Sequence, residues 1–256
     1  MTLTQKVVAV LVLAAVAVGV LLYMGRAKTT ETPVVTTSTS QSLAVPIAPM
    51  VTEKHDQKDS LSGTASKSYT LSMTYPQSSG TQLPEVYSFV HGAQAQFLDD
   101  YTSLTSAQAQ DFPAEALAYE FNVTTRVATS TNTVTYIIET YQFEGGAHGG
   151  TDVDTFTYDK SGKLVTLDDV FAKPYLVTIA SSSRQYFYNT LGDYADKDMI
   201  DSGTEATSTN FSTWYLTPST VTFMFGQYQV GPYVIGIQEF PIQKSAIKNL
   251  LAPAFQ

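Results

Sequence analysis

The sequence predicts an α+β protein whose head consists of two small fused units, each an antiparallel sheet with a packed helix, carried on one N-terminal transmembrane helix. Three observations lead to this prediction. Residues 7–24 contain no charged side chain, strand and amphipathic-helix patterns alternate from residue 67 onward, and a glycine-rich segment interrupts them midway. An aromatic content of 12%, mostly tyrosine and phenylalanine, favours strands and supplies apolar area for a core.

The charge balance of the chain limits the classes of partner that it is expected to bind. The formal net charge is −9, and the region from residue 67 onward has nine basic against nineteen acidic side chains, a net charge of −10. Such a surface repels nucleic acid and anionic lipid and attracts cationic partners, although net charge also serves solubility alone. Cysteine is absent, which excludes disulfides, cysteine nucleophiles and thiolate metal sites. We therefore expect no nucleic-acid partner.

The uncharged segment 7–24 is long enough to cross a bilayer. At about 1.5 Å per residue it spans roughly 27 Å as a helix, close to the hydrocarbon thickness. A cleavable signal peptide is the alternative, but its apolar core is usually shorter and ends in small residues, whereas this run ends in Leu-Leu-Tyr-Met. We predict an uncleaved membrane helix, with residues 1–6 as a cytoplasmic tail. Basic residues flank both ends, so charge alone leaves the orientation open.

Residues 25–66 are typical of a disordered tether. They are rich in serine and threonine, contain three prolines and have few large apolar side chains. Such a composition buries too little surface to offset the conformational entropy lost on folding. A tether beyond a membrane helix would hold the head away from the bilayer. The alternative is that the more apolar stretch 43–51 docks on the head.

The first unit of the head, residues 67–148, begins with a strand pattern. Residues 68–75 alternate polar with large apolar side chains. In the stretch 84–107, apolar side chains recur at three- and four-residue steps behind a proline, which predicts an amphipathic helix. Two further strand patterns, 117–128 and 134–143, flank a Thr-Ser-Thr-Asn turn, which predicts a hairpin.

The second unit, residues 149–256, also begins with a strand pattern, at 152–158, closed by an Asp-Lys-Ser-Gly turn. Thr166 followed by Asp168 and Asp169 is typical of a helix N-terminus, where the helix dipole favours acids, and this explains both aspartates better than a catalytic pair. The polar, acidic stretch 192–210 is expected to be a mobile loop or weak helix. The other predicted elements are a helix at 174–190, strands at 211–216, 220–225 and 233–240, and a terminal helix at 243–251.

The glycine-rich segment Glu144-Gly145-Gly146-Ala147-His148-Gly149 separates the two units. Glycine is favoured where the backbone requires a positive φ or where chains approach closely. We therefore interpret Gly145, Gly146 and Gly149 as a structural seam, across which His148 either hydrogen-bonds the backbone or contacts a ligand. Pairing of His148 with Asp152 or Asp154, in an acid–base pair or a metal site, is the chemical alternative.

The Gly-Gly-Ala-His run ending at His148 resembles a signature found at the junction of two small bacterial domains. The first is similar to the non-catalytic N-terminal domain of PdaC-type peptidoglycan deacetylases, and the second resembles the extracytoplasmic domain of the RsiV anti-sigma factor, a lysozyme sensor. Tyr158-Asp159-x-x-Gly162-Lys163, Leu167-Asp168-Asp169-Val170-Phe171 and Tyr228-Gln229-Val230-Gly231-Pro232-Tyr233 fit the same pattern. The resemblance implies a head outside the cytoplasm that binds a lysozyme-like protein or a peptidoglycan glycan. Because only six residues precede the membrane helix and no deacetylase domain follows the head, the resemblance implies neither an anti-sigma role nor deacetylation.

The candidate ligand-binding residues are His148, Tyr141, Tyr228 and Tyr233. Tyrosines around a Gly-Pro pair can form a platform for sugar rings or for a partner's side chain, although such residues also pack sheet edges. The sequence contains no His-x-x-x-His or Gly-x-Ser-x-Gly pattern, and we expect no metal, no cofactor and no catalysis. The predicted function is binding or sensing of a cell-envelope ligand. The alternatives are a cell-wall hydrolase or deacetylase centred on His148, and a structural protein without a discrete ligand.

Overall fold

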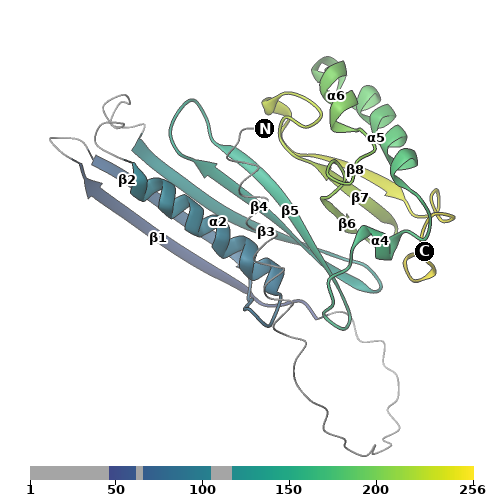
Figure 1. Ribbon diagram of the computed structural model, residues 1–256, viewed down its shortest axis with the longest axis horizontal. Coiled ribbons are helices and arrows are strands. Elements are labelled where there is room, and N and C mark those ends of the chain that lie inside the picture. The colour runs from purple at the N-terminus through teal and green to yellow at the C-terminus, as the bar shows by residue number, and fades with distance from the viewer. Residues whose placement is uncertain (1–45, 62–65, 105–116) are drawn as a thin grey trace, which may run out of the picture. The chain divides into compact units, whose positions relative to one another are not determined.

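The computed structural model describes residues 46–61, 66–104 and 117–256, and within them it has two sheets and four α-helices (Figure 1). The first sheet contains β1 (Met50–Ser60), β2 (Ser66–Pro76), β3 (Ala118–Thr129), β4 (Thr133–Phe143) and β5 (Gly150–Asp159), with helix α2 (Pro84–Ser103) between β2 and β3. The second contains β6 (Trp214–Leu216), β7 (Thr220–Phe225) and β8 (Gln238–Gln243), preceded by helices α4 (Leu167–Val170), α5 (Leu176–Thr190) and α6 (Lys197–Gly203).

The predicted α+β class is therefore confirmed, but the transmembrane helix at 7–24 and the tail at 1–6 lie outside the described residues. In the part of the chain that the structure describes, every helix is too short or too polar to cross a membrane.

The first sheet is mixed, so its prediction as an antiparallel sheet is wrong. Its strands follow the order β1-β2-β3-β4-β5, and β2 and β3 run parallel, with Tyr69 opposite Tyr119. Helix α2 connects these two strands and packs on the sheet through Val86, Val90 and Phe97. A crossover through a helix returns the chain to the same end of the sheet, and the next strand is then parallel to the first.

The prediction that a disordered tether extends to residue 66 is wrong, because residues 50–60 form strand β1. All eleven of its residues pair with β2, and the backbone N–H of Ala48 donates to the hydroxyl of Tyr136 (2.7 Å). Its side chains are mostly polar, but they reach hydroxyl groups of the core: Tyr101 donates to Asp59 at 2.8 Å and Tyr69 to Gln57 at 3.3 Å. The alternative that part of this stretch docks on the head is therefore the correct one for residues 48–51, while residues 25–45 lie outside the described residues.

Strand β5 shows that the sheet continues beyond the predicted boundary between residues 148 and 149. It pairs with β4 along its whole length, from Gly150 opposite Gln142 to Asp159 opposite Thr133. The glycine-rich segment is thus the loop of the β4–β5 hairpin rather than a seam between two sheets. An alternating pattern predicts that residues form a strand but not which sheet supplies the partner, so the predicted boundary lies before a strand that belongs to the first sheet.

The second sheet is antiparallel in the order β6-β7-β8, and the predicted strand at 220–225 is confirmed. The expected strand at 233–240 is displaced to Gln238–Gln243, and the terminal helix at 243–251 is wrong. The backbone of that segment forms turns, and two long-range bonds pair its end with residues 170–172: Ala172 N–H donates to Leu250 C=O and Ala252 N–H to Val170 C=O, both at 2.8 Å. The end of the segment is therefore held by tertiary hydrogen bonds, which the local sequence pattern does not reveal.

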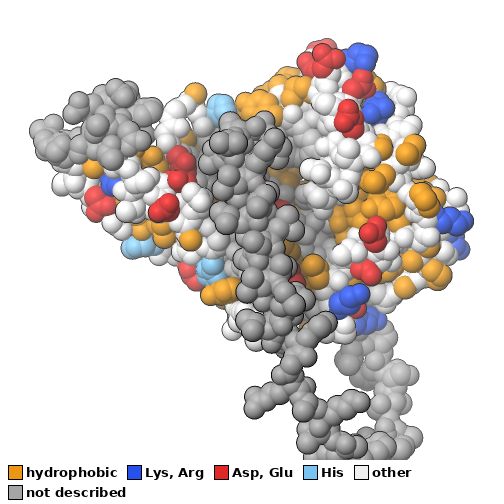
Figure 2. All heavy atoms as spheres, viewed as in Figure 1, with side chains coloured by type: hydrophobic (Ala, Val, Ile, Leu, Met, Phe, Trp, Pro, Cys, Tyr) orange, Lys and Arg blue, Asp and Glu red, His pale blue; other side chains and the backbone are white. Residues whose placement is uncertain are grey.

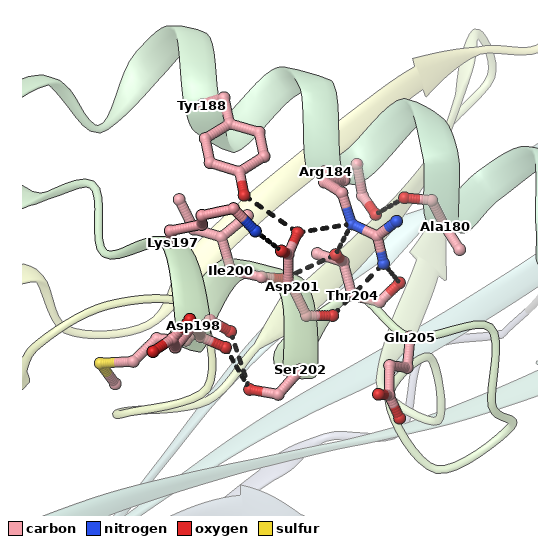
Figure 3. A network of polar contacts seen from close by, with 12 residues as sticks. Ala180, Arg184, Tyr188, Lys197, Asp198, Ile200, Asp201, Ser202, Thr204 and Glu205 are labelled. Carbon is pink, nitrogen blue, oxygen red and sulfur yellow. Dashed lines mark hydrogen bonds and ion pairs between the residues drawn. The ribbon is translucent and has the colours of Figure 1, made fainter.

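Several acidic residues of the second domain, which contains the β6-β7-β8 sheet, serve as caps and ion pairs. Thr166 and Asp169 form the predicted helix N-terminus as a reciprocal capping box at α4. The stretch expected to be a loop or weak helix contains α6, whose first turn is capped by Asp196. Acidic and basic side chains lie side by side over α6 (Figure 2). There the carboxylate of Asp201 forms ion pairs with Arg184 and Lys197 and accepts a hydrogen bond from the hydroxyl of Tyr188 (Figure 3).

The two sheets are joined through β5. Trp214 N–H donates to the hydroxyl of Thr155 (3.0 Å), and Ile137, Val153 and Met224 form a small buried cluster between the sheets. Because Ile137 and Tyr136 are neighbours on one strand, they point to opposite faces of the sheet, so the cluster lies on the face that helix α2 does not cover. The β4–β5 hairpin and its glycine loop are consequently held beside the loops of the second domain.

Candidate ligand-binding site

The loop of the β4–β5 hairpin requires its glycines. Gly145 and Gly146 adopt φ values of 92° and 95°, in the left-handed region that L side chains rarely enter. Gly149 is buried, and a Cβ atom there would lie 2.6 Å from both the Tyr141 ring and the carbonyl oxygen of Gln142. The loop therefore folds back onto Tyr141, and partial burial, followed by the charge of Glu120, raises the pKa of this tyrosine.

His148 extends from this loop toward the second domain. Its ring stacks on that of Tyr233, with centroids 4.1 Å apart and planes at 27°. The histidine is exposed, and its Nδ1 lies 2.9 Å from the carbonyl oxygen of the adjacent Gly149. Tyr228 lies next to Tyr233, with ring centroids 5.8 Å apart, and is 54% exposed. We call the row formed by His148, Tyr233 and Tyr228 the aromatic surface.

The structure thus brings three of the four candidate residues into one row, whereas Tyr141 packs against Gly149, the residue that follows His148 in the loop. No ion pair links His148 to Asp152 or Asp154 within the described ranges, where groups of three or more histidine and acidic side chains suited to a metal are also absent. The chemistry that this arrangement offers is stacking: ring faces that can pack against an apolar face of a ligand.

Tyr228 is held in a strained backbone conformation. Its φ of 62° is uncommon for a residue other than glycine, and such strain is found where the surrounding structure enforces it, often at functional sites. Here the enforcing group is Gln229. Its side chain accepts from Gly226 N–H (3.0 Å) and donates to the carbonyl oxygens of Gly203 (3.1 Å) and Asn210 (3.0 Å).

A second glutamine fixes the same loop to the first sheet. The backbone N–H of Thr151, at the start of β5, donates to the side-chain oxygen of Gln227 (2.8 Å). Sequence reasoning missed Gln227 and Gln229 because both bind backbone atoms of distant segments, and a glutamine in a loop carries no pattern that reveals such a bond. Together they hold Tyr228 and Tyr233 against the hairpin that carries His148.

A hollow on the second domain has two of its polar side chains already engaged with an aspartate. It measures about 550 Å³ and lies along α5, lined by Ser181, Ser182, Arg184, Gln185 and Tyr188. Arg184 and Tyr188 both point to Asp201 (Figure 3), with N–O and O–O distances of 3.1 and 2.9 Å. We therefore place the candidate site at the aromatic surface.

Comparison with known proteins divides the chain in two. Residues 62–151 match the family described as deacetylase PdaC, and residues 168–245 match the family described as a protein of unknown function, DUF3298. One relative is the peptidoglycan-N-acetylmuramic acid deacetylase PdaC of Bacillus subtilis, which is 30% identical over 122 residues. The match covers 46% of this chain but only 26% of that enzyme, so the chain spans about a quarter of its length.

Two solved structures share the fold. A DUF3298-family protein from Bacteroides fragilis superposes with a TM-score of 0.60, and one from Pseudomonas aeruginosa with a TM-score of 0.52. Each is 17% identical in sequence, and each match covers 82% of this chain and 96% of the other. The chain therefore carries a PdaC deacetylase-like domain and, after it, a DUF3298 domain.

Proposed function

We propose that this protein is a membrane-anchored, extracytoplasmic module that binds the glycan of the cell wall through the aromatic surface and does not transform it. The observation that carries the proposal is the stack of His148 on Tyr233. It combines one residue from each domain into a row of aromatic rings, extended by Tyr228, in which His148 and Tyr228 are exposed and Tyr233 is half-buried. Sugar rings present apolar C–H faces that pack against aromatic rings, and rigid rings lose little conformational entropy on binding.

The comparisons support the cell wall as the location of the ligand. The name of the curated relative says that it acts on peptidoglycan, and the match to the family described as deacetylase PdaC, residues 62–151, includes the loop that carries His148. The same likeness favours the alternative, a deacetylase or hydrolase centred on His148. The membrane anchor at 7–24 and the position outside the cytoplasm remain proposals that rest on the uncharged segment and on this relationship. A fusion of the C-terminus to a reporter active only outside the cytoplasm tests them.

Removal of a ring from the aromatic surface tests the binding role. We expect Tyr233→Ala in the full-length chain to weaken co-sedimentation with insoluble peptidoglycan by about tenfold or more, as for a central aromatic contact. Tyr87→Ala is the matched control, because Tyr87 is a tyrosine of α2, 39% exposed and not part of the row. Thermal unfolding of each variant checks that folding is intact. Equal binding by both variants would contradict the proposal.

The same preparations distinguish the alternatives. Release of acetate or of new reducing ends from peptidoglycan by the wild type, lost in a folded His148→Ala variant, would establish an enzyme. Binding of lysozyme without binding of glycan would reassign the ligand to a cationic protein, which the net charge of −10 from residue 67 onward would attract. We expect neither result.

A further inference from the structure

A cavity of about 360 Å³ lies beside the aromatic surface, where helix α2, the edge of the first sheet and two loops of the second domain meet. This volume lies within the range of pockets that hold small molecules. Its lining combines a short apolar wall with polar side chains and loop backbone: Phe89 and Ala93 from α2, Thr140 and Gln142 from β4, Asp152, Val153 and Asp154 from β5, and Ser212, Thr213, Gly226 and Gln229 from the second domain.

Two carboxylates of the lining lack a counter-charge. Asp152 and Asp154 are two residues apart on β5 and therefore point to the same face of the sheet. Neither forms an ion pair or a side-chain hydrogen bond with another described residue, and the lining contains no lysine, arginine or histidine. Burial, followed by the charge of Asp152, raises the pKa of Asp154 to about 6, as expected for an acid without a cationic partner.

Thr140 provides a second and independent observation at this cavity. It is directly opposite Asp152 in the β4–β5 register, so both side chains lie on the same face of the sheet. The residue is 7% exposed, and its hydroxyl oxygen is buried without a hydrogen-bond partner, although it lines the cavity. A buried hydroxyl without a partner is unfavourable and is rare in folded proteins, so its position calls for a partner from outside the chain.

The groups that line the cavity define the chemistry of that partner. Two carboxylates, the Thr140 hydroxyl and the Gln142 amide oxygen are acceptors, so a ligand that offers several N–H donors and a positive charge satisfies them. The ring of Phe89, whose centroid lies 5.5 Å from that of Phe156, provides an apolar wall for the carbon skeleton of such a ligand. An ammonium group has three donors in a compact charge and matches this set.

We propose that this cavity binds a primary ammonium group on a small ligand, such as that of a glucosamine unit or of a diamino-acid side chain, with Asp152 and Asp154 as counter-charges and Thr140 as an acceptor. The proposal goes beyond glycan binding at the aromatic surface and does not depend on it. Loss of one function by substitution need not remove the other, because the two sets of side chains are different.

Calorimetric titration of the full-length chain at neutral pH tests the proposal. The probes are a glucosamine trisaccharide, the N-acetylglucosamine trisaccharide, and Nα-acetyl-lysine amide with and without acetylation of its side-chain amine. We expect at least one free amine to bind about tenfold or more tightly than its acetylated counterpart, because a charge-assisted hydrogen bond is lost on acetylation. Preference for the sugar or for the lysine probe identifies the source of the ammonium group.

Substitutions that remove the charge locate the site. We expect Asp154→Asn to weaken amine binding by about tenfold or more, and Thr140→Val to weaken it severalfold. Asp99→Asn is the matched control: it removes the same charge from an exposed position of α2 that does not line the cavity, and it should change affinity by less than about twofold. The denaturation midpoint of Asp154→Asn should not fall, since the variant removes a half-buried carboxylate that has no cationic partner in the cavity lining, so failure to fold does not confuse the result.

Three results would overturn the inference: equal affinity for free and acetylated amines, amine binding that survives Asp154→Asn, or calcium binding that competes with the amine and requires both aspartates. The third would reassign the cavity to a metal ion. Tyr233→Ala should leave amine binding unchanged, which separates failure of this inference from failure of the glycan-binding proposal.

Discussion

The two domains of this protein build cores of different chemistry. Among the buried side chains of the first core are six tyrosines, Tyr69, Tyr75, Tyr101, Tyr119, Tyr136 and Tyr158. The second core has six phenylalanines instead, Phe171, Phe187, Phe211, Phe223, Phe225 and Phe240. A phenylalanine core needs only packing, whereas a buried tyrosine also needs a partner for its hydroxyl group.

The polar strand β1 is the consequence of this difference. Tyr75 donates to Glu53 and Tyr101 to Asp59, and both acceptors belong to β1. Glu85, at the start of α2, plays the same part for Tyr158: its carboxylate accepts a hydrogen bond from the Tyr158 hydroxyl at 2.9 Å. A strand that looks too polar to fold by itself can therefore be an essential part of a core, because the apolar area and the polar partners come from different segments.

The largest expected effect is the response of the two cores to alkaline pH. Burial, with the hydrogen bond to Glu53, raises the pKa of Tyr75 to about 12, and burial raises the pKa of Tyr69, Tyr119 and Tyr136 as well. A raised pKa contributes stability that is fully present below the unfolded value near 10 and is lost as pH rises through the folded value. We expect the first domain to unfold between pH 10 and 12.

Two spectroscopic signals separate the domains in this experiment. The buried tyrosines of the first core contribute a cooperative step to the tyrosinate absorbance when that core unfolds, while the fluorescence of the single tryptophan, Trp214, reports on the second core, in which it is buried. Tyr75→Phe should shift the alkaline transition upward, because it removes one of the groups that must ionise. A transition unaffected by this substitution would show that the buried tyrosines do not control alkaline stability.

The second effect concerns packing alone. Phe225 is fully buried, with ring centroids 4.8 Å from Phe187 and 5.6 Å from Phe211. We expect Phe225→Ala to lower the free energy of unfolding by about 3–5 kcal/mol, measured by urea unfolding followed by Trp214 fluorescence. Val177→Ala, at a position 76% exposed on α5, should stay within about 0.5 kcal/mol. Similar losses in both variants would mean that the second core is loosely packed.

The smallest effect isolates one hydroxyl partner. Glu85→Ala leaves the hydroxyl of Tyr158, a residue 2% exposed, without its acceptor, and should cost about 1–3 kcal/mol of unfolding free energy. Adding Tyr158→Phe removes the unsatisfied group, so the double variant should recover most of this loss. A double-mutant cycle in chemical denaturation measures the coupling. Strictly additive losses would show that this bond does not couple the two residues.

Local sequence patterns predicted an element correctly wherever residues close together in the chain determine its backbone conformation and hydrogen bonds. The hairpin turn before β4, the start of α2 at Pro84 and the capping box at Thr166 all depend on residues within a few positions of one another. The candidate residues His148, Tyr228 and Tyr233 were proposed from composition and resemblance. Their stacking depends on Gln227 and Gln229, which the sequence did not distinguish from other loop residues.

The sequence by itself determined the α+β class, most of the helices and strands, and the aromatic residues that the structure brings together in one row. Only the tertiary structure decided that β1 belongs to the head, that β2 and β3 are parallel, and that β5 completes the first sheet. The same is true of the cavity around Asp154 and the unpartnered hydroxyl of Thr140. The physical reason is that periodicity and capping act within a few residues, whereas strand partners, hydroxyl acceptors and cavity walls come from segments far apart in the chain.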